Sequence, residues 1–116
     1  MNHIFYYYGI FPEYIIADLN SFPAFETKFR ASLIRGFLYR WRHGELDEQD
    51  VTCLVTYIRK RLTSVFKDLC DHLPLYEFMT AYGGIPKRSI GRLLEMTKGI
   101  ECRALLLEYS QVGGKR

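Results

Sequence analysis

A tight corner between two helices is encoded by the stretch Met79-Thr80-Ala81-Tyr82-Gly83-Gly84-Ile85-Pro86-Lys87-Arg88-Ser89-Ile90-Gly91-Arg92-Leu93. Glycine readily takes the positive φ that ends a helix. Proline is favoured at the first position of the next helix, where its missing N–H costs nothing. The stretch therefore predicts one helix that stops at the glycine pair and a second that begins at Pro86. This is the arrangement of a helix-turn-helix corner.

The spacing after the glycine pair sorts the second helix into buried and outward positions. With Gly84 as the turn glycine, the buried positions go to Ile85, Ile90 and Leu93. Gly83 departs from the usual pattern, because a large apolar residue normally stabilises the first helix at that position.

The outward positions of the second helix include Lys87, Arg88, Ser89 and Arg92. Arginine suits bidentate contact with guanine, and lysine or serine suits contact with phosphate. We therefore expect these four residues to bind nucleic acid. The alternative is an ordinary helical corner whose basic side chains are only solvated, since motif matches of this length are weak.

Apolar residues recur with a helical period through most of the chain. The expected helices cover about residues 23–43, 48–69, 74–82, 86–98 and 100–110, and the period is cleanest in 48–69. Residues 4–11 form a short aromatic run that fits either a strand or an irregular arm. The sequence thus predicts an all-α bundle of about five helices in a single domain, 1–116, with an N-terminal arm (1–20), a helical core (21–110) and a mobile tail (111–116).

The first long helix carries a second group of basic residues. Lys28, Arg35, Tyr39 and Arg42 fall on one side of it, opposite the apolar positions. Such a row is able to follow a phosphate backbone while the tyrosine stacks on a base. An ordinary solvated helix face explains the same pattern, and both interpretations stay open.

Aromatic residues are concentrated near the N-terminus, where Tyr6, Tyr7, Tyr8 and Phe11 lie within six positions. Tyrosine joins a large apolar face to a polar tip and is enriched at protein interfaces. These residues therefore predict either a surface for a protein partner or a second copy of the chain, or an arm packed on the bundle.

Composition indicates the class of protein and the compartment to which the chain belongs. The chain has 116 residues, 48% of them hydrophobic and 25% charged, so a folded domain is expected. Its net charge of +3 is below that of a strongly basic nucleic-acid binder. The three cysteines are widely spaced and form no CxxC pair, which favours a reducing, cytoplasmic compartment. Neither a secretory signal nor a membrane span fits the N-terminus.

No pattern in the sequence points to catalysis. Histidines and cysteines lack the spacing of a zinc site, and there is no phosphate-binding glycine loop. We therefore expect a non-enzyme without cofactor or metal. The preferred function is a regulator or accessory factor that binds nucleic acid, DNA rather than RNA, through the corner. The alternative is a protein-interaction module (an adaptor, inhibitor or chaperone-like protein) that uses the aromatic N-terminus or the basic face of the first long helix.

Overall fold

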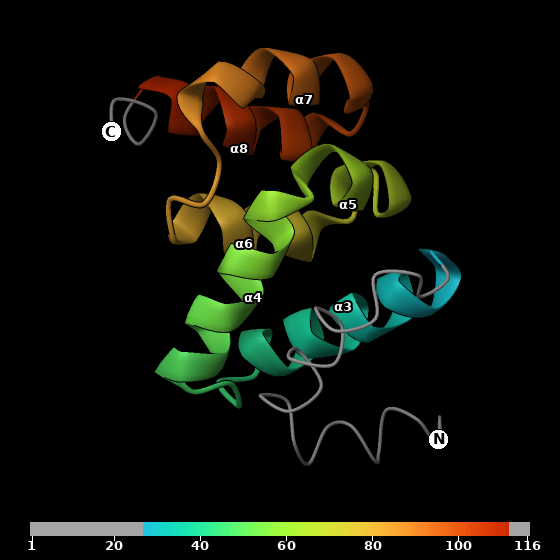
Figure 1. Ribbon diagram of the computed structural model, residues 1–116. Coiled ribbons are helices and arrows are strands. Elements are labelled where there is room, and N and C mark those ends of the chain that lie inside the picture. The colour runs from blue at the N-terminus through green and yellow to red at the C-terminus, as the bar shows by residue number, and fades with distance from the viewer. Residues whose placement is uncertain (1–26, 112–116) are drawn as a thin grey trace. The chain divides into compact units, whose positions relative to one another are not determined.

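The computed structural model describes residues 27–111, and these form helices and no strand (Figure 1). The elements in chain order are α3 (Thr27–Arg42), α4 (Glu48–Lys60), α5 (Leu62–Asp68), α6 (Leu73–Ala81), the 3-10 turn η1 (Lys87–Ser89), α7 (Ile90–Met96) and α8 (Ile100–Gln111). The all-α prediction is confirmed for this part of the chain. The predicted N-terminal arm and its possible strand, and the tail from residue 112 on, lie outside the described residues.

The chain divides into two compact units, Met1–Tyr57 and Ile58–Arg116. In the first unit, α3 buries Leu33, Ile34, Phe37 and Leu38, as its apolar spacing predicts. Gly44, at φ +71°, ends the helix as expected.

Backbone hydrogen bonds at this helix end show why the glycine is needed. The N–H of Gly44 donates to the carbonyl of Trp41 at 3.0 Å, and that of Glu45 to the carbonyl of Arg40 at 2.8 Å. This pair of bonds satisfies carbonyls that the end of the helix would otherwise leave without partners. The next helix is capped by Asp47, whose carboxylate accepts the N–H of Asp50 at 2.8 Å.

The single helix predicted over residues 48–69 is wrong, because the structure breaks it at Arg61. The backbone of Arg61 leaves helical geometry (φ −125°, ψ 36°), and its N–H donates to the carbonyl of Ile58 at 3.0 Å, three residues back. Apolar residues keep their helical spacing on both sides of the break, and Leu54, Ile58, Leu62, Val65, Phe66 and Leu69 are all buried. The apolar period alone therefore could not reveal the interruption.

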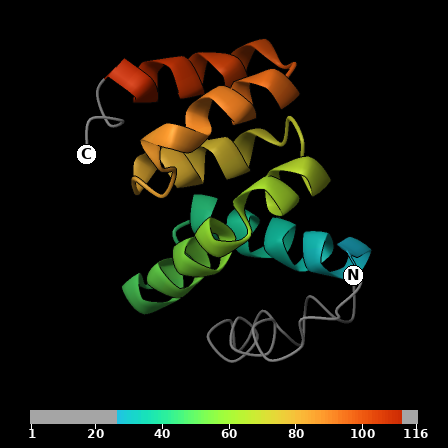
Figure 2. The same ribbon diagram turned by 45° about the horizontal axis from the view of Figure 1, so that its top comes forward.

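In the second unit, α8 packs against both α6 and α7, and α5 packs against α7 (Figure 1 and Figure 2). The Phe66 ring meets the Tyr76 ring edge-on, with centroids 4.9 Å apart. Thr97 donates its hydroxyl proton to the carbonyl of Leu93 at 2.6 Å, so Tyr76 is the donor in its own 2.8 Å bond to the Thr97 hydroxyl. The buried hydroxyl groups of Tyr76 and Thr97 are therefore both hydrogen-bonded.

The turn from α7 to α8 is fixed by a side chain from a distant loop. Asp71, at φ +63°, accepts the backbone N–H groups of Lys98 at 3.0 Å and Gly99 at 2.8 Å. Arg103 donates to the carbonyls of Leu94 and Thr97 at the end of α7. These bonds connect the loop that carries Asp71 to the start of α8, and they connect α8 to the end of α7.

Candidate nucleic-acid interface

The corner between α6 and η1 is built by the same kind of helix ending as in α3, centred on Gly83. Gly83 has φ +64°, and its N–H faces the carbonyl of Thr80 at 3.4 Å. The N–H of Gly84 donates to the carbonyl of Met79 at 2.9 Å. Gly83 is thus the first residue past the helix, which explains why no large apolar residue stands there. The positive φ belongs to Gly83 and not to Gly84, the glycine that the sequence pattern placed in the turn.

The buried side of the corner is as predicted. Ile85, Ile90 and Leu93 are 2%, 5% and 0% exposed. The hydroxyl of Tyr109 on α8 donates to the carbonyl of Ile85 at 2.6 Å, inside the protein. This bond attaches the middle of the turn to α8, because a buried carbonyl needs a hydrogen-bond donor.

The second helix does not begin at Pro86. Pro86 keeps an extended backbone (φ −63°, ψ 143°), and its carbonyl accepts the N–H of Ser89 at 2.9 Å. A 3-10 turn, η1, therefore comes first, and the α-helix starts at Ile90. Lys87 and Arg88 are carried by this tighter turn, where side chains point differently from those of an α-helix.

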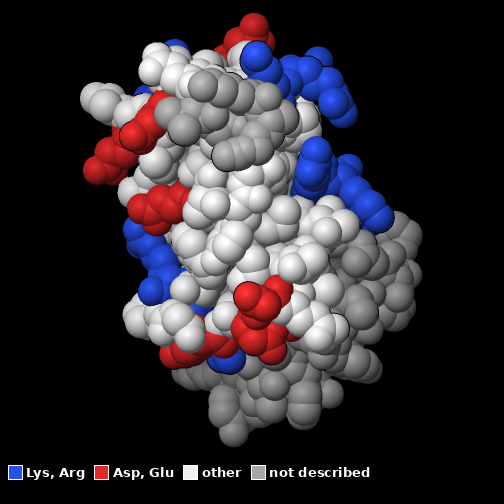
Figure 3. All heavy atoms as spheres, turned by 90° about the vertical axis from the view of Figure 1, so that its left-hand side faces the viewer, with Lys and Arg blue, Asp and Glu red and all other residues white. Residues whose placement is uncertain are grey.

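The three predicted basic residues of the corner are all exposed. Lys87 and Arg88 project from η1 and Arg92 from α7, while Ser89 is half-buried. Within residues 27–111, none of the three cations forms an ion pair, and Glu95 and Glu101 are not engaged with them. In Figure 3, lysine and arginine side chains gather at the upper right, where α7 lies. The cations are therefore available to an anionic ligand.

A hollow of about 460 Å³ opens beside the corner. Its walls are formed by Arg59, Thr80, Ala81, Tyr82, Gly83, Ile85, Pro86 and Tyr109. Tyr82 is 48% exposed and packs its ring against Phe78, with centroids 5.2 Å apart. No pattern in the sequence indicates this hollow, because Arg59 on α4 is far from the corner in the chain.

The predicted basic group on α3 belongs to the first unit. Arg35, Tyr39 and Arg42 are exposed, Tyr39 to 64%. Lys28 lies in the first turn of α3, and its side chain is outside the described part. The predicted partner-binding residues Tyr6, Tyr7, Tyr8 and Phe11 also lie outside the described residues.

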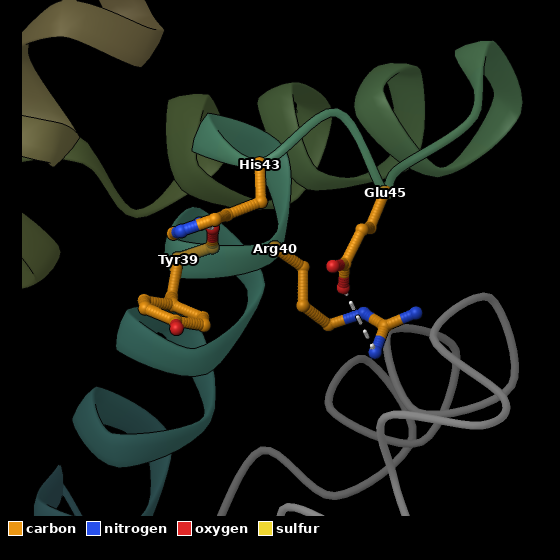
Figure 4. A network of polar contacts seen from close by, with 4 residues as sticks. All are labelled: Tyr39, Arg40, His43 and Glu45. Atoms are coloured by element: carbon orange, nitrogen blue, oxygen red, sulfur yellow. Dashed lines mark hydrogen bonds and ion pairs between the residues drawn. The ribbon is translucent and has the colours of Figure 1, made fainter.

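The exposed ring of Tyr39 has a neighbour that the sequence pattern did not indicate. His43 lies against it, with ring centroids 4.3 Å apart, and its Nδ1 is 2.9 Å from the carbonyl oxygen of Tyr39 (Figure 4). Beside them, Arg40 forms an ion pair with Glu45 at 3.7 Å (Figure 4). The end of α3 therefore presents two rings in contact at its surface, tilted by 38° to each other.

Two thiols of the second unit are held in the protonated form. Burial raises the pKa of Cys102 to about 11. Burial and the neighbouring carboxylate of Asp71 raise the pKa of Cys70, whose Sγ donates to the carbonyl of Met96 at 3.0 Å. A nucleophilic cysteine needs the opposite shift, because the thiolate is the reactive species.

Across residues 27–111, no three His, Cys, Asp or Glu side chains are grouped so as to hold a metal ion. None of the helices described is long and apolar enough to cross a membrane. No protein-family model, curated protein or solved structure matches the chain. The geometry and the charges of the corner are therefore the features from which a function can be proposed.

Proposed function

We propose that this chain binds nucleic acid through the corner between α6 and α7, as a regulator or accessory factor without catalytic activity. The observation that carries the proposal is the set of three exposed cations, Lys87, Arg88 and Arg92, at the start of the second helix of the corner. None of them has an ion-pair partner in the described part of the chain.

Unpaired surface cations favour a polyanion for a physical reason. Each cation that meets a phosphate releases a condensed counterion from the nucleic acid, and this release drives association at low salt. A cation already paired with a carboxylate would have to break that pair first. No ion pair within residues 27–111 has to be broken before Lys87, Arg88 or Arg92 binds a phosphate.

The backbone that carries these cations is fixed by contacts within the second unit. Gly83 fixes the end of α6, and the Tyr109 hydroxyl holds the carbonyl of Ile85 in the turn. Ile90 and Leu93 anchor α7 from the buried side. Because little backbone order is lost on binding, the contacts keep most of their free energy.

The basic face of α3 is proposed as a second contact. Arg35 and Arg42 suit phosphate, and the exposed ring of Tyr39 suits stacking on a base. Tyr39 already lies against His43, so its ring is held in place before a ligand arrives.

The proposal is tested by fluorescence polarisation with labelled duplex DNA, single-stranded DNA and structured RNA at about 50 mM salt. The double variant Lys87→Ala, Arg88→Ala is compared with the double variant Lys67→Ala, Lys98→Ala. The control pair removes the same charge from exposed lysines elsewhere in the second unit. We expect the corner variant to lose on the order of 10-fold in affinity and the control variant to change little.

Equal losses in the two variants would show that net charge, and not the corner, determines binding. An absence of binding to every probe would refute the proposal. Duplex DNA is the preferred ligand, because the second helix of such a corner is shaped to enter a major groove.

A protein-interaction module is the second candidate function, and the surface of α3 favours it. Tyr39 is 64% exposed and its ring contacts that of His43, with Arg35 one turn before it. Tyrosine and arginine are enriched where proteins meet. Capture of a protein partner that is lost with Tyr39→Ala and kept with Lys87→Ala, Arg88→Ala would favour this function over nucleic-acid binding.

A further inference from the structure

The hollow beside the corner has the volume of a small-molecule site. Its volume of about 460 Å³ falls in the range of roughly 300–1,000 Å³ that small-molecule sites occupy. It is lined by Gly83, Ile85 and Pro86, which precede the basic residues of η1 directly in the chain. The hollow therefore lies next to the proposed nucleic-acid contacts Lys87 and Arg88.

The residues that line this hollow include an aromatic residue, Tyr82, and a cation, Arg59. Tyr82 leaves 48% of its surface exposed while Phe78 supports its ring from α6. Arg59 on α4 is exposed and lines the same hollow. A ring with a guanidinium nearby is the usual means of holding an unpaired nucleotide, since the base stacks on the ring and the cation meets its phosphate.

Two residues that line the hollow carry hydroxyl groups, and each hydroxyl is the donor in a hydrogen bond to a backbone carbonyl. Thr80 donates its hydroxyl proton to the carbonyl of Tyr76 at 2.7 Å, and Tyr109 donates its own to the carbonyl of Ile85 at 2.6 Å. Thr80 is half-buried and keeps its oxygen as a hydrogen-bond acceptor, whereas Tyr109 is buried. Acceptors match the exocyclic amino groups of adenine, cytosine and guanine, which are donors.

We infer that this hollow receives a single unpaired base from the nucleic acid that the corner binds, with Tyr82 as the stacking surface and Arg59 as the phosphate contact. The inference rests on the proposed function and specifies its ligand as DNA with an unstacked nucleotide beside a duplex. Lys87, Arg88 and Arg92 hold the duplex, and the hollow selects the site at which a base is free to leave the stack.

The test compares three DNA duplexes with the same paired sequence: one without a bulge, one with a single bulged adenine, and one with an abasic residue at the bulge. The abasic duplex keeps the bend and the phosphate but lacks the base. We expect the protein to bind the adenine bulge on the order of 10-fold more tightly than the abasic bulge, because one stacked base is removed. Tyr82→Leu should abolish this difference, and Tyr82→Phe should keep it.

Arg59→Gln provides a second variant that does not touch the aromatic packing. It should weaken binding to both bulged duplexes by a similar factor and leave the preference for adenine over the abasic site intact. Thermal unfolding followed by circular dichroism shows that each variant is folded.

The outcomes separate the two proposals. Equal affinity for the adenine and abasic bulges, in a protein that still loses binding with Lys87→Ala, Arg88→Ala, would overturn the base pocket and leave the proposed function standing. A preference that survives Tyr82→Leu would also overturn it. Failure to bind any of the three duplexes would overturn both.

Discussion

Gly83 determines where α6 ends, because it alone supplies the positive φ that the two backbone bonds of the corner require. A Cβ at this position would meet no heavy atom within 4 Å, so the restriction lies in the backbone conformation and not in packing. Side chains in this region of φ and ψ raise the free energy of the native state by about 1 kcal/mol.

Gly83→Ala should therefore lower the free energy of unfolding by about 1 kcal/mol and the melting temperature by about 4 °C. Gly91→Ala is the matched control. Gly91 lies in α7 without a positive φ, and an added Cβ there has open space. Alanine favours a helix more than glycine does, so this control should raise stability by roughly 0.5–1 kcal/mol. Thermal melts of the two variants with the same sign of shift would contradict this account of the corner.

Cys102 makes stability depend on pH in the alkaline range. Its pKa is raised from 9.0 to about 11 by burial, so the folded protein keeps the thiol protonated where the unfolded chain ionises it. Stability from this thiol is complete below about pH 8 and is lost as pH rises through 9 toward 11. Between pH 8 and 10 the loss is about 1.4 kcal/mol.

Urea unfolding at pH 8 and pH 10 measures this effect. Cys102→Ala should show a smaller drop between the two pH values than the unchanged protein, since alanine does not ionise. Cys70→Ala should also reduce the drop, because burial and the carboxylate of Asp71 raise the pKa of Cys70 in the fold. An identical drop in the Cys102→Ala variant would show that the thiol has no part in the pH dependence.

Helix α8 carries apolar residues on its exposed side as well as on its buried side. Leu106 is fully buried, whereas Ile100 is 85% and Leu107 47% exposed. Leu106→Ala should reduce the free energy of unfolding by about 2–5 kcal/mol. Ile100→Lys should change it by less than about 0.5 kcal/mol. Chemical denaturation of both variants checks this, and a large loss in Ile100→Lys would mean that Ile100 is covered in solution.

Helix positions and helix ends are the features that the sequence predicts best. Apolar spacing identified the buried residues of α3, α4 and α7, and Gly44 and the Gly83-Gly84 pair marked two of the ends. These signals are local, because a helix face and a glycine at positive φ depend on a few neighbouring residues.

The features that the sequence could not supply depend on contacts between distant segments. The break at Arg61 leaves the apolar period unchanged, so no pattern records it. Asp71 caps α8 from 28 residues away, as its bond to Gly99 shows. Arg59 joins the walls of the hollow only because the end of α4 reaches the corner in the fold.

At the scale of the whole molecule, the net charge of +3 is too small to attract nucleic acid without a local concentration of charge. The corner provides one, with three exposed cations within six residues, none of which forms an ion pair with another residue of 27–111. Binding should therefore depend on few phosphate contacts and respond strongly to the loss of these three.

The most direct test of the proposal is the salt dependence of duplex DNA binding, measured from about 50 to 200 mM salt for the unchanged protein and for the Lys87→Ala, Arg88→Ala, Arg92→Ala variant. We expect the logarithm of the binding constant to fall linearly with the logarithm of salt concentration. The slope in the variant should be less steep by roughly 2–3, since each lost phosphate contact contributes about 0.9. An unchanged slope and affinity in the variant would contradict the central claim that the corner is the nucleic-acid site.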